Sequence, residues 1–598
     1  MLFSKKVSPF AVRLISFFLA FLGSFFLIRY FPSLSTSSFF VFLSFFAVFM
    51  AFVSNRPESA IFLAALILSC LFAVSIVFGY SYDQIDSYGF IFKSRATLFT
   101  AIGAILSLAF FTTCFLSCVL SGLLRSVPEG SLHIKPSTYF LFVFIVLCLG
   151  SIPYLILYWP GLNIYDTHDQ ILQFFGYPSY IGDGSALTDH HPVFLTCIYG
   201  LFMQAGLALG SATLGQILYS ILSLTAVSLG FAVLLTYLYT HGMPLSLGIS
   251  MALFLAIWPV TATYAFNMCK DVSAVPLLLL YLTAMLCIHF SDGTCFTSKP
   301  YSVSFILISF LLMIVRKSAF PALLFSAFFL FMAYKAVRPR ILLSSGISIA
   351  LFLIYSMVLL PILGVLPGET HEMLSIPFQQ TARYFNEYPE DISEEEKTAV
   401  SSVLSLDSFN DYDPRLSDAV KDRSNPDASR SDYIAYFKTW GRMGIRHPGV
   451  YLDAWLNMIY GYFYPSESNT VLCLTLNSPD VDSLVLTQNP ALSDARLSFY
   501  NTVYYVLRRL PVLGILFYVP FITWAFFVLL AALALKYGFR CIAPWSFFIG
   551  TFIICLFSPK SGEIRYIFPL LYALPAMLGL LLTGKESSIG SIQNPSKR

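Results

Sequence analysis

Charged side chains are scarce in this sequence. Asp, Glu, Lys and Arg together account for 11% of its 598 residues, whereas soluble domains carry about 25%. The formal net charge is only +3, and no basic cluster of the kind that binds nucleic acid stands out. The composition therefore excludes an ordinary soluble protein, and we expect no nucleic-acid partner.

Several catalytic and metal-binding motifs are also absent. The sequence has no GxxxxGK[ST] phosphate loop, no HExxH and no GxSxG, which disfavours cytoplasmic nucleotide chemistry, zinc proteolysis and the common serine-hydrolase arrangement. Most of its 11 cysteines lie in apolar runs, without a CxxC pair or a disulfide framework. No internal repeat stands out, which disfavours transporter folds built from duplicated halves.

Hydrophobic residues are abundant instead. They make up 57% of the chain, and the mean hydropathy is +0.75. A transmembrane helix needs about 20 mainly apolar residues, and strand-like alternation does not recur, so we expect an all-α polytopic membrane protein with a bundle of about 14 transmembrane helices. The predicted spans are 9–30, 37–55, 59–81, 98–124, 137–158, 214–240, 245–265, 272–290, 301–315, 318–334, 341–363, 511–535, 542–558 and 566–584.

The positions of Lys and Arg predict the orientation of these spans. With the N-terminus inside, the cations of the 125–135, 335–340 and 536–540 loops and of the C-terminal tail all fall on the cytoplasmic side, as the positive-inside rule requires. The segment 193–209 fits this count only as a re-entrant or interfacial helix on the outer side, and the alternative is an ordinary span. The N-terminal residues lack a cleavage site, so we expect a retained first helix.

This topology divides the chain into four parts. Residues 1–136 form an N-terminal membrane extension of four helices, and residues 137–363 form a membrane core with an outer loop at 159–192. Residues 364–510 form a small α-rich extracytoplasmic domain, and residues 511–598 contain the last spans and a short cytoplasmic tail. We expect a multi-pass protein of the plasma membrane with its functional residues on the extracytoplasmic face.

The outer loop at 159–192 is the strongest functional signal. Titratable side chains gathered beside a membrane usually mark chemistry rather than packing. The loop reads WPGLNIYDTHDQILQFFGYPSYIGDGSALTDHHP and contains Asp166, His168, Asp169, Asp183, Asp189, His190 and His191. Three further charged pairs fall on the same predicted face: Lys270 with Asp271, Arg316 with Lys317, and Glu563 with Arg565.

Two motifs of this loop region resemble the GT-C superfamily of membrane glycosyltransferases: WPGLNIYDTHDQ and TDHHPVFLT. The motifs FNMCKD, SIPFQQTARYF, MIYGYFYP and GEIRYIFP are similar to a bacterial branch of that superfamily known mainly as a domain of unknown function. The resemblance covers about residues 137–584. It implies a GT-C-like bundle with a large outer cavity, a polyprenyl-phosphate sugar donor that arrives from the membrane, and an acceptor that arrives from outside.

The resemblance places the catalytic carboxylate at Asp166, which we assign as the general base. Asp169 is three residues further on and shares its helix face. The alternative for Asp166 is a cap on a short helix over 167–175.

Asp189 is grouped with these catalytic candidates, and His190 and His191 follow it before a proline that fixes the chain direction. They are candidates for orienting the base, binding the acceptor or ligating a metal. No cofactor is certain, and a divalent cation stays an open alternative.

Basic and polar residues supply the predicted substrate contacts. Arg316 and Lys317 suit a phosphate clamp, and the alternative is snorkelling at the interface. Lys270 and Asp271 contact substrate or form a simple ion pair with each other. Arg565, with Glu563 and Tyr566, is a further substrate-binding candidate, and the alternative is an interfacial anchor. Gln379 and Gln380 are the last candidates, and the alternative for them is a solvated helix face.

Three functions are compatible with these residues. The first is a membrane glycosyltransferase that moves a sugar from a polyprenyl-phosphate donor to a cell-envelope glycan, glycolipid or protein. The second is a transporter or flippase of lipid-linked glycans, and the third is a polymerase or ligase of surface polysaccharide. Transport should place ionisable residues near the membrane midplane, so their concentration on one face favours transfer.

Overall fold

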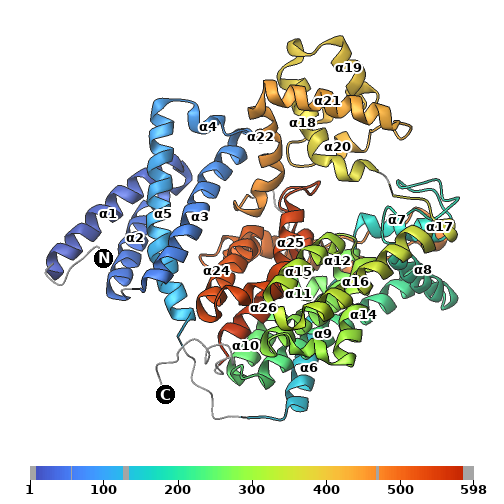
Figure 1. The fold of residues 1–598 in the computed structure, drawn as a ribbon, viewed down its shortest axis with the longest axis horizontal. Helices are drawn as coiled ribbons and strands as arrows, with labels where there is room; N and C mark the ends of the chain where they lie inside the picture. Colours follow the sequence, from blue (N-terminus) through green and yellow to red (C-terminus); the bar gives the residue numbers. More distant parts are fainter. Residues whose placement is uncertain (1–7, 56, 126–132, 369, 467–470, 584–598) are drawn as a thin grey trace.

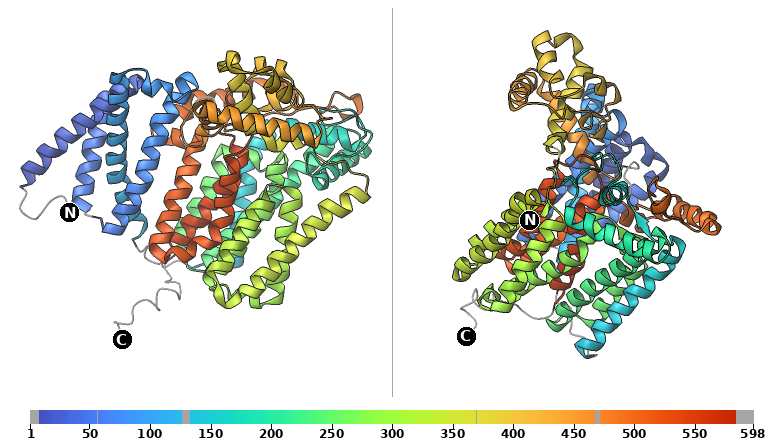
Figure 2. Two further views of the ribbon diagram at one scale, coloured as in Figure 1. Left: turned by 45° about the horizontal axis from the view of Figure 1, so that its top comes forward. Right: turned by 90° about the vertical axis from the view of Figure 1, so that its right-hand side faces the viewer.

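The computed structural model describes residues 8–55, 57–125, 133–368, 370–466 and 471–583. The N-terminal residues 1–7 and the tail 584–598, to which the topology assigns cytoplasmic cations, lie outside the described residues. The described chain is almost entirely helical, and its one sheet pairs two strands of two residues each. In Figure 2 the long helices run side by side, and a smaller group of helices lies across one set of their ends.

In the described part of the chain, ten helical segments are long and apolar enough to cross a membrane, which makes the protein a multi-pass membrane protein. They are Pro9–Tyr30, Pro32–Asn55, Ser59–Ile85, Arg95–Leu123, Pro136–Leu157, Ala212–Thr240, Lys270–Phe290, Lys335–Ile362, Val519–Tyr537 and Ile564–Leu581. The other four predicted spans are shorter apolar helices, at Leu245–Ile257, Lys299–Val315, Ala319–Ala333 and Phe539–Cys555. The expected count of 14 is therefore not confirmed.

The shorter helices end where the sequence interrupts them. α10 (Leu245–Ile257) stops before Trp258-Pro259, and a proline disfavours a helical conformation in the residue that precedes it. α14 (Lys299–Val315) and α15 (Ala319–Ala333) are separated at Arg316 and Lys317. The segment at 193–209 forms α8 (Val193–Ala208), a helix of 16 residues that packs between α7 (Tyr165–Phe174) and α9 (Ala212–Thr240).

The N-terminal extension is a separate bundle of four long helices (Figure 1, blue). Its helices pack against one another through two apolar clusters of their own that are rich in Phe. They are α1 (Pro9–Tyr30), α2 (Ser38–Asn55), α3 (Ser59–Ile85) and α5 (Arg95–Leu123), with the one-turn α4 (Gly89–Phe92) between the last two.

The membrane core surrounds one continuous apolar cluster. Besides α7, α8, α9, α10, α14 and α15, the core contains six further helices that precede residue 364. They are α6 (Pro136–Leu157), α11 (Pro259–Tyr264), α12 (Lys270–Ser273), α13 (Val275–Phe290), α16 (Arg338–Ile354) and α17 (Leu360–Ile362). The C-terminal helices α24 (Val519–Tyr537), α25 (Ser546–Cys555) and α26 (Phe568–Leu581) complete it. α26 packs against α9, α13 and α24, so the two ends of the core sequence meet.

The segment between α17 and α24 forms a compact helical domain. It is followed by residues 471–486, which return to the membrane core and are called the returning strap. The domain has its own apolar core, which runs from Phe378 to Tyr451 and contains aromatic side chains such as Phe409 and Tyr436. Its helices are α18 (Ser375–Glu387), α19 (Glu394–Ser401), α20 (Asp418–Lys421), α21 (Arg430–Arg446) and α22 (Pro448–Ile459). Residues 471–486 belong instead to the apolar cluster of the membrane core, and α23 (Ser493–Asn501) follows them.

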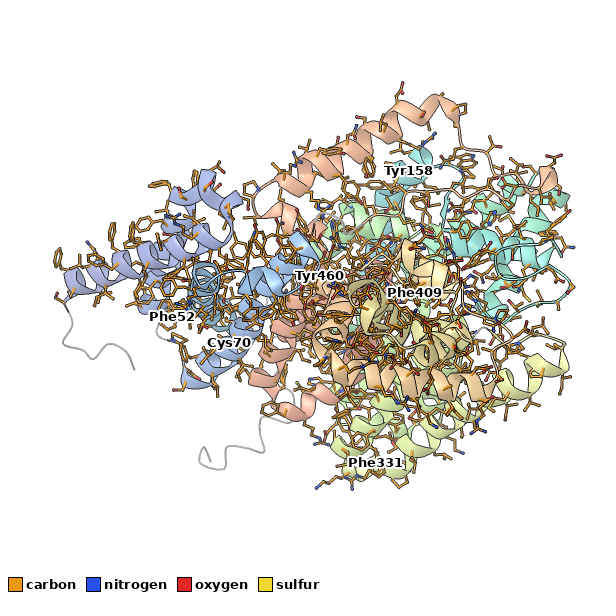
Figure 3. The ribbon with its side chains drawn as sticks, turned by 90° about the horizontal axis from the view of Figure 1, so that it is seen from above. Phe52, Cys70, Tyr158, Phe331, Phe409 and Tyr460 are labelled. Atoms are coloured by element: carbon orange, nitrogen blue, oxygen red, sulfur yellow. The ribbon has the colours of Figure 1, made fainter. Side chains whose placement is uncertain are left out.

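A corner of the N-terminal bundle is fastened to this helical domain. Asp453 of α22 accepts hydrogen bonds from the Tyr82 hydroxyl (2.7 Å), the Ser87 hydroxyl (2.6 Å) and the Tyr88 backbone N–H (3.1 Å). Arg383 of α18 lies 3.5 Å from the same carboxylate. Figure 3 shows the neighbouring Tyr460 where the blue bundle meets the rest of the molecule.

Candidate active site

A short parallel strand pair brings the two halves of the site together. In β1 (Leu162–Asn163) and β2 (Asn267–Met268), Leu162 pairs with Asn267 and Asn163 pairs with Met268. Each strand leads within three residues into a helix that carries charge in its first turn: Asp166 in α7 and Lys270 in α12. This register sets the two side chains beside each other.

The strand pair is held in place from both sides. The Thr167 hydroxyl donates to the Met268 carbonyl (2.5 Å), which ties α7 to β2. The returning strap contributes the other contacts: the Asn163 N–H donates to the Thr475 carbonyl (3.0 Å), and the Asn477 N–H donates to the Asn163 side chain (2.5 Å). Asn163 is fully buried, so these bonds replace its contacts with water.

Asp166 is an ion-pair partner and not a helix cap. The residue that precedes α7 is Ile164, and no side-chain capping bond is present. The Asp166 carboxylate lies 2.8 Å from Lys270 Nζ and 3.9 Å from Arg565 Nη1. Lys270 Nζ also lies 3.3 Å from His191 Nδ1, so the loop before α8 is joined to the same group.

A second carboxylate, Asp271, pairs with Arg316. Its Oδ1 lies 3.1 Å from Arg316 Nε, and both side chains are nearly buried. Arg316 Nη2 also donates to the Tyr566 carbonyl (3.0 Å), which fixes the start of α15 against the start of α26. Lys270 and Asp271 thus take separate partners, and the ion pair between them that the sequence left open is not formed.

Arg565 connects the two carboxylates. Its Nη1 lies 3.9 Å from Asp166 and 4.0 Å from Asp271, while its Nε lies 3.1 Å from Glu563. Glu563 in turn lies 2.8 Å from Lys560. Neither Arg565 Nη1 nor Asp271 Oδ2 has a hydrogen-bond partner, although both atoms are buried. A buried donor and acceptor without partners are what a hydroxyl-bearing ligand or a water would satisfy.

Asp189 and Lys317 form a third pair at the rim of this cluster. Lys317 Nζ lies 2.9 Å from the Asp189 carboxylate and also donates to the Asp189 carbonyl. The Asp189 N–H donates to the Leu366 carbonyl (2.7 Å), so the strand-like segment after α17 holds this loop. The Lys317 side chain is 39% exposed, which leaves its ammonium accessible from the adjoining cavity.

A cavity of about 510 Å³ adjoins this cluster of side chains. Three cations (Lys270, Arg316, Lys317) and two carboxylates (Asp271, Glu372) line it, together with His190, His191 and Tyr566. The opposite wall is apolar and comes mainly from α25 and the residues that follow it. The volume falls in the range of small-molecule and cofactor sites.

Neighbouring charges lower the pKa of two acids near the cavity, Asp166 and Glu372. Burial favours the neutral form of Asp166, but the nearby charges of Lys270 and Arg565 outweigh it and hold the pKa of Asp166 well below its usual range. Burial likewise opposes ionisation of Glu372, yet a hydrogen bond from His371 and the charge of Lys421 lower the pKa of Glu372 to about 2. Asp166 and Glu372 are therefore ionised at neutral pH.

Burial lowers the pKa of the two histidines and of Lys317, whereas it raises the pKa of an acid. Burial lowers the pKa of His190 to about 4 and holds that of His191 well below its usual value, so both imidazoles are neutral near pH 7. Burial also lowers the pKa of Lys317, although Asp189 opposes this change. His190 Nδ1 is buried without a hydrogen-bond partner, which makes it a candidate ligand contact.

Three of the predicted site residues lie apart from this cluster. Asp169 pairs with His168 (3.2 Å), and burial raises the pKa of its carboxyl. Gln379 and Gln380 are buried in the helical domain, where Gln379 donates to the Asp413 carbonyl (2.8 Å) and Gln380 to the Tyr451 carbonyl (3.1 Å). Those contacts hold the domain together, and the solvated helix face considered for the glutamines is not present.

Two residues of the helical domain belong to the site and were not predicted from the sequence. Glu372 lines the cavity. Lys421 Nζ lies 2.5 Å from Glu372 Oε1. Both come from the acidic outer segment, in which nothing in the spacing distinguishes them from solvated neighbours. Only the packing of α20 beneath the 370–374 turn, with Ser417 N–H bound to the Pro559 carbonyl (2.9 Å), brings them inward.

One group of possible metal ligands occurs in the described part of the chain. Ligand atoms of His371, Glu372 and Asp422 lie within 4.8 Å of one another. Lys421 Nζ lies 2.5 Å from Glu372 and 3.2 Å from Asp422. Because the Lys421 ammonium already contacts both of these carboxylates, it takes the place of a cation there, and we derive no metal-dependent step.

The chain belongs to the family of unknown function DUF6020, whose model matches residues 181–593. The match includes Asp189, Lys270, Arg316, Lys317 and Arg565 but not Asp166. The family resemblance was expected to begin near residue 137, so the match starts later than expected. The N-terminal bundle also lies outside it. No curated protein and no solved structure matches the chain.

Proposed function

We propose that this DUF6020 protein is a membrane glycosyltransferase of the GT-C type. It transfers a sugar from a polyprenyl-phosphate donor to a cell-envelope glycan, glycolipid or protein on the extracytoplasmic face. The observation that carries the proposal is an ionised carboxylate, Asp166, next to a cavity lined by Lys270, Arg316 and Lys317. This arrangement supplies both a proton acceptor and charge stabilisation for a phosphate leaving group.

The proposed reaction uses these two parts of the site. An acceptor hydroxyl attacks the anomeric carbon of the donor, the bond between that carbon and the phosphate oxygen breaks, and the hydroxyl proton passes to Asp166. The polyprenyl phosphate gains one negative charge as it leaves. Arg316 binds phosphate oxygens through its planar guanidinium, and Lys317 adds a mobile point charge.

Lys270 couples the two parts. Its ammonium holds the pKa of Asp166 low in the unliganded protein, and a carboxylate with a low pKa is a weak base. Lys270 also lines the cavity, where a donor phosphate competes for it. A shift of Lys270 from Asp166 toward the phosphate raises the pKa of Asp166 and makes it a stronger base only when donor is bound.

The distribution of ionisable groups supports transfer over transport. The ion pairs of Asp166, Asp189, Asp271 and Glu563 lie at helix ends and connecting loops. A transporter carries such residues near the midplane of its helices.

Sugar transfer by purified protein in nanodiscs tests the proposal. A panel of synthetic polyprenyl-phosphate sugars is offered to the wild type, to Asp166→Asn and to Asp183→Asn. Asp183 is the matched control, because it lies in the same outer loop but is exposed and bonded only locally to Ser185. We expect Asp166→Asn to lower the transfer rate by roughly 10²- to 10⁴-fold and Asp183→Asn to keep the wild-type rate.

Two results contradict the proposal. One is a folded Asp166→Asn variant that transfers sugar at the wild-type rate. The other is a wild type that consumes no donor but moves lipid-linked glycan across a proteoliposome bilayer unchanged, which would replace the transferase with a flippase.

A further inference from the structure

The N-terminal bundle is bound to the helical domain through Asp86, the residue that ends α3 (Figure 1). The Asp86 backbone takes the left-handed conformation that commonly terminates helices, with a φ of 54°. Its carbonyl accepts hydrogen bonds from Arg383 Nη1 (2.9 Å) and from Asn457 Nδ2 (2.6 Å). Its carboxylate lies 3.2 Å from Arg415 Nη2. Asp86 therefore contacts the helical domain at three points, and one of them is an ion pair.

The backbone around Arg415 is also bound to the connection between α25 and α26. Residues 415–417 run antiparallel to residues 559–561 of that connection. Two backbone hydrogen bonds, both 2.9 Å long, join them: Ser561 N–H to the Arg415 carbonyl, and Ser417 N–H to the Pro559 carbonyl. Arg415 thus contacts the N-terminal bundle with its side chain and the membrane core with its backbone.

The connection leads directly into the charged cluster of the site. Arg565 follows residues 559–561 closely in the sequence, and its Nε lies 3.1 Å from Glu563. Its Nη1 lies 3.9 Å from Asp166 and 4.0 Å from Asp271. The place of Arg565 between these two carboxylates therefore depends on where residues 559–561 are held.

The N-terminal bundle reaches the site through this series of contacts and not directly. The residues that line the cavity include none from the described bundle, 8–55 and 57–125. The bundle also lies outside residues 181–593, which the family model matches. A segment that does not touch the substrate can still affect a reaction by displacing a group that does, since a misplacement of about 1 Å can cost roughly 10²-fold in rate.

We propose that Arg415 is a positioning residue, which couples the docking of the N-terminal bundle at Asp86 to the place of Arg565 in the site. The inference rests on the proposed function, in which Arg565 lies beside the general base. The geometry selects Arg415 among the three partners of Asp86. Arg383 and Asn457 bind its carbonyl from α18 and α22, whereas the Arg415 backbone is itself bound to Ser561.

Hydrogen exchange of residues 559–566 in nanodiscs tests the coupling without a measurement of activity. Asp86→Asn removes the charge and suits the left-handed backbone, which Asn tolerates, and Arg415→Gln removes the other partner. We expect each variant to exchange about threefold faster in this segment, as befits one partly exposed ion pair. The double variant should exchange no faster than either single variant, because all three lack the same contact. Arg442→Gln is the control and should keep the wild-type exchange, since Arg442 pairs with Glu395 inside the helical domain (3.7 Å).

The kinetics of sugar transfer distinguish a positioning role from a loss of folded protein. We expect Arg415→Gln to lower kcat roughly tenfold with little change in the KM of the donor, because Arg316 and Lys317 remain in place to bind its phosphate. Arg415→Lys keeps a cation for Asp86 and should restore most of the rate. A loss that Arg415→Lys does not restore would overturn the inference, and so would an equal loss in Arg442→Gln.

The failures of the two proposals are distinguishable. If the exchange results hold in a protein that transfers no sugar, the coupling to Arg565 stands and the transferase is rejected. Sugar transfer at the wild-type kcat in Arg415→Gln would retain the transferase and reject the positioning role. Unchanged exchange in residues 559–566 would also reject it, as would additive effects of the Asp86 and Arg415 substitutions, since the two residues would then act separately.

Discussion

Lys270 Nζ lies 2.8 Å from the Asp166 carboxylate, although α8, α9, α10 and α11 separate the two residues in the sequence. Both side chains are 27% exposed, and Lys270 also lines the cavity. The same ammonium contacts His191. One cation thus joins the outer loop of the membrane core to the start of α12.

Replacement of Lys270 tests its role at this junction. In Lys270→Met we expect sugar transfer to fall by roughly 10²-fold, because one preorganised charge beside the reacting phosphate is lost. Lys560→Met is the control, because Lys560 pairs with Glu563 and does not line the cavity. Equal transfer rates in the two variants would argue against a role for Lys270.

Arg316 and Lys317 should respond differently to removal of their charge. Arg316→Gln leaves Asp271, which is 4% exposed, without its nearest partner, and an unpaired buried charge costs about 3–5 kcal/mol. Lys317 is 39% exposed, so Lys317→Gln should cost no more than about 1 kcal/mol while still weakening binding of undecaprenyl phosphate. Thermal unfolding in detergent measures the loss of stability, and binding of undecaprenyl phosphate to the protein in nanodiscs measures the loss of affinity. An Arg316→Gln protein as stable as Lys317→Gln would contradict the buried pairing.

His190 should make stability depend on pH in mildly acidic solution. Burial lowers its pKa from 6.5 to about 4 in the folded protein. Between these values the unfolded chain binds a proton that the folded protein does not, so the free energy of unfolding rises with pH from about 4 to 6.5. His190→Gln removes this contribution and should flatten the pH dependence of the unfolding temperature in that window. An unchanged profile would show that the imidazole stays as accessible to protons in the folded state as in the unfolded state.

Asp453 should hold the N-terminal bundle to the helical domain. Asp453→Asn removes the charge that accepts from Tyr82, Ser87 and the Tyr88 N–H, and charge-assisted hydrogen bonds contribute about 1.5–3 kcal/mol each. We expect faster hydrogen exchange in residues 82–88 and in α18. Asp427→Asn, an exposed position, should leave exchange there unchanged. Faster exchange in both variants would point to a general loss of stability.

The apolar segments were predictable because each carries its own signal. Every predicted span overlaps a described helix, since about 20 apolar residues without partners for their backbone groups must form helix in a membrane. Helix lengths were less predictable. Pro259 ends α10, and Arg316 with Lys317 separates α14 from α15, so these three helices are shorter than a full span.

The sequence also indicated which residues share a site but not how they pair. Asp166, Lys270, Arg316 and Arg565 were grouped because they border spans at the same predicted face, and the structure brings them together. Their catalytic and binding roles stay predictions. The pairing of Lys270 with Asp166, and of Asp271 with Arg316, depends on the register of β1 and β2, two strands too short to recognise in the sequence.

By itself the sequence determined that this chain is a helical membrane protein and that its ionisable residues gather at helix ends, because hydrophobic length and the cost of burying charge act locally along the chain. Only the tertiary structure decided that Glu372 enters the cavity, that Gln379 and Gln380 support the helical domain, and that α25 forms one wall of the cavity. These features are contacts between segments far apart in the sequence. Each depends on how complete helices pack, which no single segment encodes.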